Sequence, residues 1–226
     1  MTVNVKKDIE KIYNSDIFDE ELYFVGGTAL SFYLSHRISE DIDIVSSKTL
    51  NHRKIIPSMS VLGAKKLQDE NITALRMAGL FPDEYVIKFV LDDVKLEFFQ
   101  ANRVIQKEIL SNATFTDFNN SKLKILDVKS IAKLKLVALI KRDKSRDLFD
   151  FGAILKYDVL SIDEIIELFS KVENSIQSTY DIINFIKSKK EPMDDEAVYL
   201  DETYRIDLTY EEIKKEVIDK LPKSSK

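Results

Sequence analysis

Two aspartates separated by one residue, Asp41 and Asp43, lie in the otherwise apolar stretch DIDIV. In a β-strand alternate side chains share a face, so both carboxylates project from one side while Ile42 and Ile44 point to the other. Two neighbouring carboxylates repel each other by about 1 to 4 kcal/mol, depending on the local dielectric. A divalent cation removes that cost, and Mg²⁺ prefers one or two carboxylates together with phosphate oxygens and water. The spacing therefore predicts a metal–phosphate site.

A pair of glycines precedes these aspartates, in a chain that has five glycines altogether. Gly26 and Gly27 follow the apolar residues LYFV and come just before a segment, near Thr28, that has helical character. Glycine lets the backbone approach a ligand closely, and a helix N-terminus offers free N–H groups to an anion. Either pattern alone is typical of a turn or a solvated strand end, but their combination favours a phosphate cradle. The P-loop and Rossmann patterns need further residues that this segment lacks.

The composition limits the possible classes of protein. The chain has 226 residues, is 44% hydrophobic and carries a net charge of −5, which permits a real core and does not indicate a nucleic-acid binder. It has no cysteine, which excludes disulfides, zinc–cysteine sites and thiol catalysis. No signal peptide is visible, and no stretch approaches the roughly 20 apolar residues that span a bilayer. We therefore expect a cytoplasmic protein that has no membrane partner.

The elements that position these residues divide the chain into an α+β N-terminal half and a helical C-terminal half, with a boundary near 110 to 125. Helices are expected at 5–14 and near 28–35. Alternating and β-branched runs predict strands at 22–25, 41–45, 85–91 and 94–100, the last two joined as a hairpin by Asp92 and Asp93. The run ITALRMAG, residues 72–79, is interpreted as a further strand. Three-and-four spacing of apolar residues predicts helices over 127–142, 145–157, 161–175 and 210–221.

Residues 20–155 resemble the nucleotidyltransferase (DNA polymerase β-like) superfamily. Its signature is a glycine followed by Gly or Ser, a spacer, and Asp-x-Asp or Asp-x-Glu; here 13 residues separate Gly27 from Asp41. The resemblance implies a mixed sheet with flanking helices, with the core over residues 1–115 and a helical region over 116–226. It also implies a third carboxylate on a later strand. Glu97 occupies that position, where the family more often has Asp.

The stretch KILDVKSIAKLKLVALIKRDKSRDLFDFGAIL resembles the second block of the AbiEii-type (AbiEii/AbiGii) toxins, which are nucleotidyltransferases of bacterial toxin–antitoxin systems. That block has a lysine on a helix, then Arg-Asp, then a further Asp, and four residues match it: Lys135, Arg146, Asp147 and Asp150. Lys135 also lies in an apolar stripe, where a lysine needs a partner, and Arg142 lies two turns further along. A triphosphate would suit both cations, and the stripe predicts that methionine is tolerated at position 135.

The resemblance implies transfer of a nucleoside monophosphate from an NTP to an acceptor hydroxyl, with release of pyrophosphate. Asp41 and Asp43 would hold Mg²⁺ or Mn²⁺, and Glu97 would help to hold a second metal ion or would activate the acceptor. The implied acceptor is the 3′ end of tRNA, and the implied partner is a cognate antitoxin. The alternatives are nucleotidylation of a small molecule or a protein side chain, or a catalytically silent nucleotide-binding regulatory module. His36 and Arg37 are further candidates for a phosphate or substrate contact, although isolated histidines are more often structural.

Overall fold

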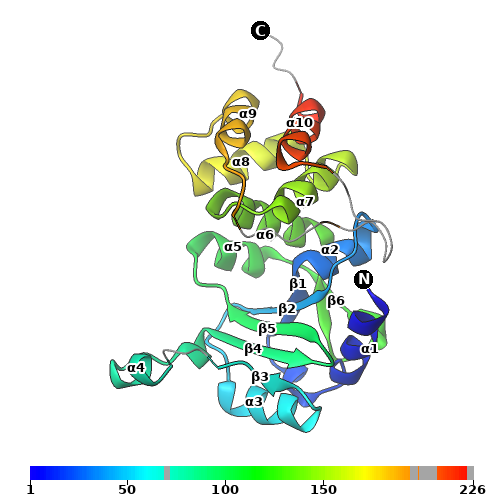
Figure 1. Cartoon of the computed structure of the whole chain (residues 1–226), viewed down its shortest axis with the longest axis vertical. Coiled ribbons are helices and arrows are strands. Elements are labelled where there is room, and N and C mark those ends of the chain that lie inside the picture. Colours follow the sequence, from blue (N-terminus) through cyan, green and yellow to red (C-terminus); the bar gives the residue numbers. More distant parts are fainter. Residues whose placement is uncertain (69–71, 194–197, 199–207, 223–226) are drawn as a thin grey trace. The chain divides into compact units, whose positions relative to one another are not determined.

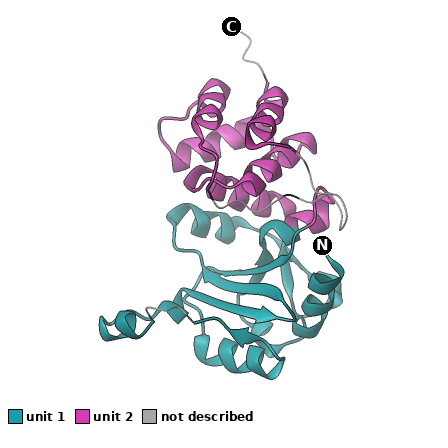
Figure 2. Ribbon diagram, in the orientation of Figure 1, with its two compact units in different colours: residues 1–29, 39–127 teal, residues 30–38, 128–226 magenta. Residues whose placement is uncertain are grey.

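The computed structural model describes residues 1–68, 72–193, 198 and 208–222. It contains two compact units, coloured separately in Figure 2. Unit 1 consists of residues 1–29 and 39–127, and unit 2 consists of residues 30–38 and 128–226. Each unit is therefore assembled from two separate pieces of the chain.

Unit 1 contains a mixed sheet, in which the described residues form seven strands in the order β3-β4-β5-β2-β1-β7-β6 (Figure 1). Strand β2 is parallel to β5 and β1 is parallel to β7, whereas the other neighbours are antiparallel. This mixed sheet with flanking helices confirms the expected α+β class. The strands are β1 Tyr23–Val25, β2 Asp41–Ser46, β3 Lys65–Lys66, β4 Val86–Leu91, β5 Val94–Gln100, β6 Phe115–Asp117 and β7 Lys124–Leu126.

The predicted hairpin is confirmed as the antiparallel pair β4–β5. Its two turn residues, Asp92 and Asp93, have φ angles of 43° and 70°. Consecutive positive φ values are typical of a type I′ turn, which matches the twist of the flanking strands, and Asp tolerates this conformation better than most residues. The turn fixes the register of the hairpin and therefore decides which face of the sheet each β5 side chain occupies.

The two faces of the sheet differ sharply in polarity around β2 and β5. On one face the side chains are buried and apolar, and the rings of Phe89 and Phe98 meet edge to face with centroids 6.0 Å apart. Helix α1, Val3–Ile12, contacts β2 and β5 and buries Val5 and Ile9. The opposite face carries the charged residues of both strands. The alternation expected for the DIDIV segment is confirmed, since Ile42 and Ile44 are fully buried while both aspartates are half-buried.

The remaining helices of unit 1 connect these strands. Helix α2, Gly26–Leu34, begins in unit 1 and continues into unit 2. Two helices that the sequence did not lead us to expect follow: α3, His52–Val61, and α5, Val104–Asn112. Short 3₁₀ helices occupy Asp16–Asp19, Pro82–Glu84 and Phe118–Asn120.

The prediction of a strand over residues 72–79 is wrong, because residues Ile72–Met77 form helix α4. Ala, Leu, Arg and Met are strong helix formers, and they outweigh the two β-branched residues at the start. Gly79, with φ +77°, ends the helix. The N–H of Leu80 donates to the carbonyl of Leu75 and the N–H of Gly79 to that of Arg76, which is a Schellman motif.

Unit 2 contains helices α6 to α10 in its described part. Four of them confirm predicted helices: α6 Val128–Lys141, α7 Ser145–Lys156, α8 Ile162–Val172 and α10 Tyr210–Lys220. Helix α9, Thr179–Ser188, is additional. Ser161 caps α8 in a reciprocal capping box with Glu164. Phe169 contacts the rings of Phe151 and Phe185 in the core of this unit. None of the described helices is both long and apolar enough to cross a membrane.

Candidate active site

The glycine pair and the aspartate pair meet in unit 1. Val25 is the register partner of Asp43, so the residue that follows β1 lies beside the Asp43 side chain. Gly26 has φ +80°, and a Cβ placed on it would lie 2.7 Å from Cγ and 2.8 Å from Cβ of Asp43. The Asp43 carboxylate therefore packs directly against the Gly26 backbone. Only glycine provides both this close approach and this backbone conformation.

Helix α2 begins at Gly26, two residues before the expected start, so both glycines belong to its first turn. The free N–H groups of that turn are therefore supplied by glycine backbone. Thr28 is fully buried, and its hydroxyl donates a hydrogen bond to the carbonyl oxygen of Asp41. This bond ties the first turn of α2 to the first residue of β2. The Thr28 side chain consequently has a structural role, and only its backbone can serve an anion.

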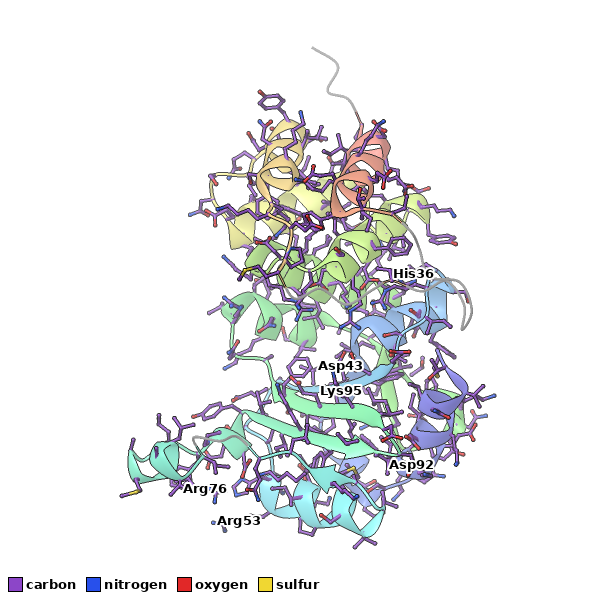
Figure 3. The ribbon with its side chains drawn as sticks, in the orientation of Figure 1. His36, Asp43, Arg53, Arg76, Asp92 and Lys95 are labelled. Atoms are coloured by element: carbon purple, nitrogen blue, oxygen red, sulfur yellow. The ribbon has the colours of Figure 1, made fainter. Side chains whose placement is uncertain are left out.

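The third carboxylate lies beside the second in the sheet. Asp43 and Glu97 are register partners in the parallel pair β2–β5, and Asp41 is the partner of Lys95 in the same pair. Partners in a parallel ladder project to the same face, so these four side chains share one surface. Figure 3 labels Asp43 and Lys95 on the two adjacent strands. The expected placement of Glu97 on the sheet face of the aspartates is thus what the structure shows.

A lysine that the sequence did not lead us to consider lies on the same sheet face as Asp43 and Glu97. Lys88 on β4 is the register partner of Glu97, and its Nζ lies 3.5 Å from Oε2 of Glu97. Their side chains are 56% and 36% exposed, so this ion pair contributes about 0 to 1 kcal/mol and can open easily. Glu97 can therefore leave Lys88 when another charged group arrives.

The donor set fits a cation that arrives together with phosphate. In the part of the chain that the structure describes, no three His, Cys, Asp or Glu side chains are grouped closely enough to hold a metal by themselves. Asp41 and Asp43 nevertheless offer two carboxylates on one face, close to free backbone N–H groups. Mg²⁺ is bound in this way, by one or two carboxylates plus substrate phosphates and water, and rarely by a complete protein cage.

Unit 2 contains a buried cluster of charges centred on Asp150, which is fully buried. Arg37 grips it with two bonds, from Nε to Oδ1 at 2.7 Å and from Nη2 to Oδ2 at 3.1 Å. Nε2 of His36 lies 2.7 Å from Oδ1, and Nζ of Lys135 lies 2.9 Å from Oδ2. Four donors therefore surround one carboxylate, which has about four lone-pair positions.

Asp147 forms the second half of this cluster. Arg142 binds it through Nε at 2.5 Å and Nη2 at 3.0 Å, and Nζ of Lys135 lies 3.5 Å from its Oδ1. The Lys135 side chain is only 11% exposed and is shared by the two carboxylates. Three permanent cations thus face two carboxylates. Among the residues that the structure describes, these five groups carry one net positive charge, which suits an anionic ligand.

One prediction made for Lys135 from its sequence neighbours is wrong. Its apolar neighbours on α6 predicted that methionine would be tolerated, but its ammonium group compensates two buried carboxylates. Removing one member of a buried ion pair leaves an unpaired charge and is strongly destabilising. The structure brings Lys135, Arg142, Asp147 and Asp150 together, as expected. It adds His36 and Arg37, whose position just before the DIDIV segment was the only sequence signal of their importance.

The positive groups in the cluster keep both aspartates ionised. Burial raises the pKa of Asp150, but Arg37, Lys135 and the hydrogen bond from His36 outweigh burial and hold that pKa well below its ordinary value of 3.8. Burial likewise raises the pKa of Asp147, and Lys135 with Arg142 lowers it to a net value below 3.8. Both carboxylates are therefore charged throughout the physiological range.

This cluster makes the stability of unit 2 sensitive to acid. Because the folded-state pKa values of Asp147 and Asp150 lie below the unfolded value of 3.8, the unfolded chain binds more protons at low pH. The stabilisation is complete well above pH 3.8 and is lost as the pH falls through 3.8 towards the folded-state values. We expect urea unfolding followed by circular dichroism between pH 3 and 6 to show this loss, with a shallower slope in Asp147→Asn. An equal slope in that variant would contradict the assignment.

Solved structures of similar fold include a nucleotidyltransferase toxin. The structure superposes on JHP933 from Helicobacter pylori with a TM-score of 0.52 and 19% identity, covering 96% of this chain and 89% of that one. It also superposes on MenT4, the nucleotidyltransferase toxin Rv2826c of Mycobacterium tuberculosis H37Rv, with a TM-score of 0.54 and 11% identity, covering 96% and 80%. At these identities the likeness concerns the fold, which is that of a nucleotidyltransferase.

The family follows from the sequence as a whole. The model of the family described as nucleotidyl transferase AbiEii toxin, type IV toxin–antitoxin system, matches residues 12–223. The chain belongs to this family and is a nucleotidyltransferase. A curated relative, protein aq_aa25 of Aquifex aeolicus (strain VF5), is 24% identical over 200 residues, which cover 87% of this chain and 89% of the relative.

The contact between Gly26 and Asp43 leads to a prediction with an internal control. Gly26→Ala and Gly79→Ala both place alanine at a similar positive φ, +80° and +77°, and each should lose about 1 to 2 kcal/mol of stability. A Cβ on Gly79 meets no atom within 4 Å, whereas a Cβ on Gly26 displaces the Asp43 carboxylate. We expect only Gly26→Ala to lose nucleotide transfer, by about 100-fold, the usual effect of a misplacement of about 1 Å. Equal transfer by the two variants would show that Asp43 does not need its present position.

Proposed function

We propose that this nucleotidyltransferase transfers a nucleoside monophosphate from an NTP to the 3′ hydroxyl of tRNA, using Mg²⁺ or Mn²⁺, as the toxin of a toxin–antitoxin pair. The observation that carries the proposal is the packing of the Asp43 carboxylate against Gly26 in the first turn of α2, with Glu97 beside it in register. Carboxylates and free backbone N–H groups at one point are suited to a metal-bound phosphate.

Each of the unit 1 residues has a distinct role in this proposal. Asp41 and Asp43 hold the cation, which when bound supplies positive charge to the attacking and leaving oxygens. The backbone N–H groups of Gly27 and Thr28 orient the phosphates. The acceptor oxygen forms a bond to the α-phosphorus while the bond between the α-phosphorus and the bridging oxygen breaks, and pyrophosphate leaves. Glu97 accepts the proton of the acceptor hydroxyl.

The cations of the second sequence block supply positive charge to the triphosphate in this proposal. Two of the three ammonium hydrogens of Lys135 can serve Asp147 and Asp150, and a third stays available for a phosphate oxygen, as judged from the residues that the structure describes. Arg142, whose side chain is 57% exposed, can keep one bond to Asp147 and turn another to phosphate. Arg146 belongs to the same block, and we propose that it also binds nucleotide.

The proposal of an antitoxin partner is supported by family membership, since the family is described as toxins of a toxin–antitoxin system. The tRNA acceptor is proposed from the resemblance to the AbiEii-type toxins alone. NTPs and tRNA are both cytoplasmic, so we propose that the reaction takes place there. Nucleotidylation of a small molecule or of a protein side chain uses the same chemistry with another acceptor. A silent nucleotide-binding module is less favoured, because such a module gains nothing from keeping two repelling carboxylates beside a glycine turn.

One assay separates these possibilities. Purified protein is incubated with Mg²⁺, each α-³²P-labelled NTP in turn, and total RNA, and the label is then located by gel electrophoresis and thin-layer chromatography. We expect label in the tRNA band, and its loss when the tRNA 3′ terminus is oxidised with periodate beforehand. Label on the protein or on a small molecule would identify the alternative acceptors. No label with any NTP would contradict the proposal.

The role of Glu97 gives a graded prediction. Glu97→Gln should leave NTP binding nearly unchanged, because the Asp pair and the glycine turn remain, but it should slow single-turnover transfer by about 10² to 10⁴-fold, the range for general base catalysis. Lys88→Gln is the matched control, since it breaks the same ion pair and keeps the carboxylate. Equal slowing in both variants would assign the effect to the ion pair, and wild-type transfer by Glu97→Gln would exclude Glu97 as the base.

A further inference from the structure

We infer that His36 and Arg37 are positioning residues of this enzyme, which hold the Asp150 carboxylate and through it fix the Lys135 ammonium group. The inference rests on the proposed role of Lys135 at the triphosphate. All four residues belong to unit 2. Neither His36 nor Arg37 is assigned to phosphate or substrate, which corrects the direct contact considered from the sequence.

Arg37 provides the rigid part of this arrangement. Its Nε and Nη2 grip both oxygens of Asp150, and its Nη1 donates to the carbonyl of Ile38 at 2.9 Å. The side chain is 2% exposed. A bidentate guanidinium–carboxylate pair fixes the plane of the carboxylate as well as its distance, which a lysine cannot do. Arg37 therefore sets the direction in which Oδ2 of Asp150 presents its lone pairs to Lys135.

His36 completes the coordination of the same carboxylate. Asp150 is ionised and can only accept hydrogen bonds, so the hydrogen between the two side chains must lie on Nε2 of His36. The imidazole is held by a stacked contact with Phe149, at 6.2 Å between ring centroids. Its Nδ1 is buried, and among the residues that the structure describes it has no hydrogen-bond partner. Among the described residues, the Asp150 carboxylate is therefore the hydrogen-bond partner of this ring.

Lys135 receives its position at the end of this chain of contacts. A lysine side chain has four rotatable bonds, and its ammonium group is a point charge with little directional preference. Oδ1 of Asp150 is occupied by His36 and by Nε of Arg37, and Oδ2 accepts one bond from Nη2 of Arg37, which leaves the second acceptor position of Oδ2 to Lys135 at 2.9 Å. If either donor is lost, the carboxylate can rotate and Lys135 can follow it. A displacement of about 1 Å at a charged group can cost about 100-fold in rate.

A cavity beside His36 makes this inference testable by chemical rescue. The cavity measures about 280 Å³, and its lining includes Ser35, His36, Phe149, Lys156 and Tyr157. Shortening His36 to alanine extends the cavity to the Asp150 carboxylate. Imidazole can then enter and donate an N–H to Asp150 in place of the lost ring. Neutral 1-methylimidazole has almost the same shape but no N–H, so it cannot replace that donor.

The experiment measures single-turnover transfer by His36→Ala at about pH 9, where both imidazoles are uncharged. We expect a loss of about 10- to 100-fold, restored by millimolar imidazole and not by 1-methylimidazole. His36→Gln, which keeps a donor, should retain more activity than His36→Leu. Wild-type transfer by His36→Ala, equal rescue by the two imidazoles, or a loss that neither imidazole nor glutamine restores would overturn the inference.

A double-mutant cycle separates this inference from the proposed function. Arg37→Lys and Lys135→Met are combined, and both transfer rate and urea stability are measured. If the contacts of His36 and Arg37 with Asp150 act through Lys135, Arg37→Lys lowers the transfer rate in the wild-type background and has little further effect in Lys135→Met. If Lys135→Met transfers normally, the proposed role of Lys135 fails. Coupling between the effects of the two substitutions on the free energy of unfolding would still show that Arg37 and Lys135 interact through Asp150. Additive effects on both the transfer rate and the free energy of unfolding would overturn the inference.

Discussion

Asp41→Asn and Asp43→Asn are each expected to abolish nucleotide transfer while the protein stays folded. Each substitution removes one of two carboxylates that share a sheet face beside the first turn of α2. The loss should reach at least about 10² to 10³-fold, which is the usual cost of removing one electrostatic stabiliser of a transition state. Stability should stay level or rise, because the substitution also relieves repulsion between the two charges. Transfer by labelled NTP and thermal unfolding measure the two effects on the same preparations.

A matched control is available in the same sheet. Asp93→Asn makes the same chemical change in the β4–β5 turn, where the positive φ of 70° suits asparagine as well as aspartate. We expect it to transfer at the wild-type rate and to unfold at the same temperature. Full activity in Asp41→Asn or Asp43→Asn would remove these carboxylates from the reaction, and with them the basis of the proposed metal site.

Asp150→Asn is expected to be the most destabilising of the conservative substitutions considered. The amide has nearly the same shape as the carboxylate, but it leaves Arg37 facing a neutral group in a buried site, and Lys135 with Asp147 alone. Breaking a buried ion pair by removing one partner costs about 3 to 5 kcal/mol. Urea unfolding at pH 7 measures this directly. The same variant should bind NTP more weakly, because Lys135 loses its fixed position.

Asp158→Asn serves as the comparison for this stability measurement. Asp158 follows α7 in an exposed position with φ +49°, a conformation that asparagine adopts readily. Exposed substitutions of this kind usually change stability by less than about 0.5 kcal/mol. If Asp150→Asn were no less stable than Asp158→Asn, the cluster around Asp150 would not be a set of true buried ion pairs.

The sheet around the site was predictable because its signals are local. Alternation placed Ile42, Ile44 and the two aspartates on their correct faces, and it also placed Glu97 on the face opposite Leu96 and Phe98. The prediction of a strand over residues 72–79 was wrong because it, too, relied on a local pattern. Short apolar runs suit helix and strand equally, and the strong helix propensity of that stretch together with the Schellman motif at Gly79 decided the outcome.

The partners of Asp150 could not be predicted from local pattern. Arg37 and Asp150 are 113 residues apart in the sequence, and no pattern near either residue predicts that they pair. Spacing on the helix draws attention only to Arg146, which precedes Asp150 by four residues. Lys88 was overlooked because a lysine on an alternating strand is usually a solvated residue, and only the register of β4 against β5 places it opposite Glu97.

The division of each unit into two chain segments has a consequence for biosynthesis. Residues 30–38 leave the ribosome early, but Arg37 can form its bonds to Asp150 only after another 113 residues have been made. At about 5 to 20 residues per second, that delay is about 6 to 23 s. Throughout that interval Arg37, four positions ahead of Asp41, does not yet have the Asp150 carboxylate as a partner. An interrupted or truncated translation product ending near residue 127 would contain both aspartates and the seven described strands, yet would lack Asp150. The bonds between Arg37 and Asp150 therefore form only after residue 150 has been made.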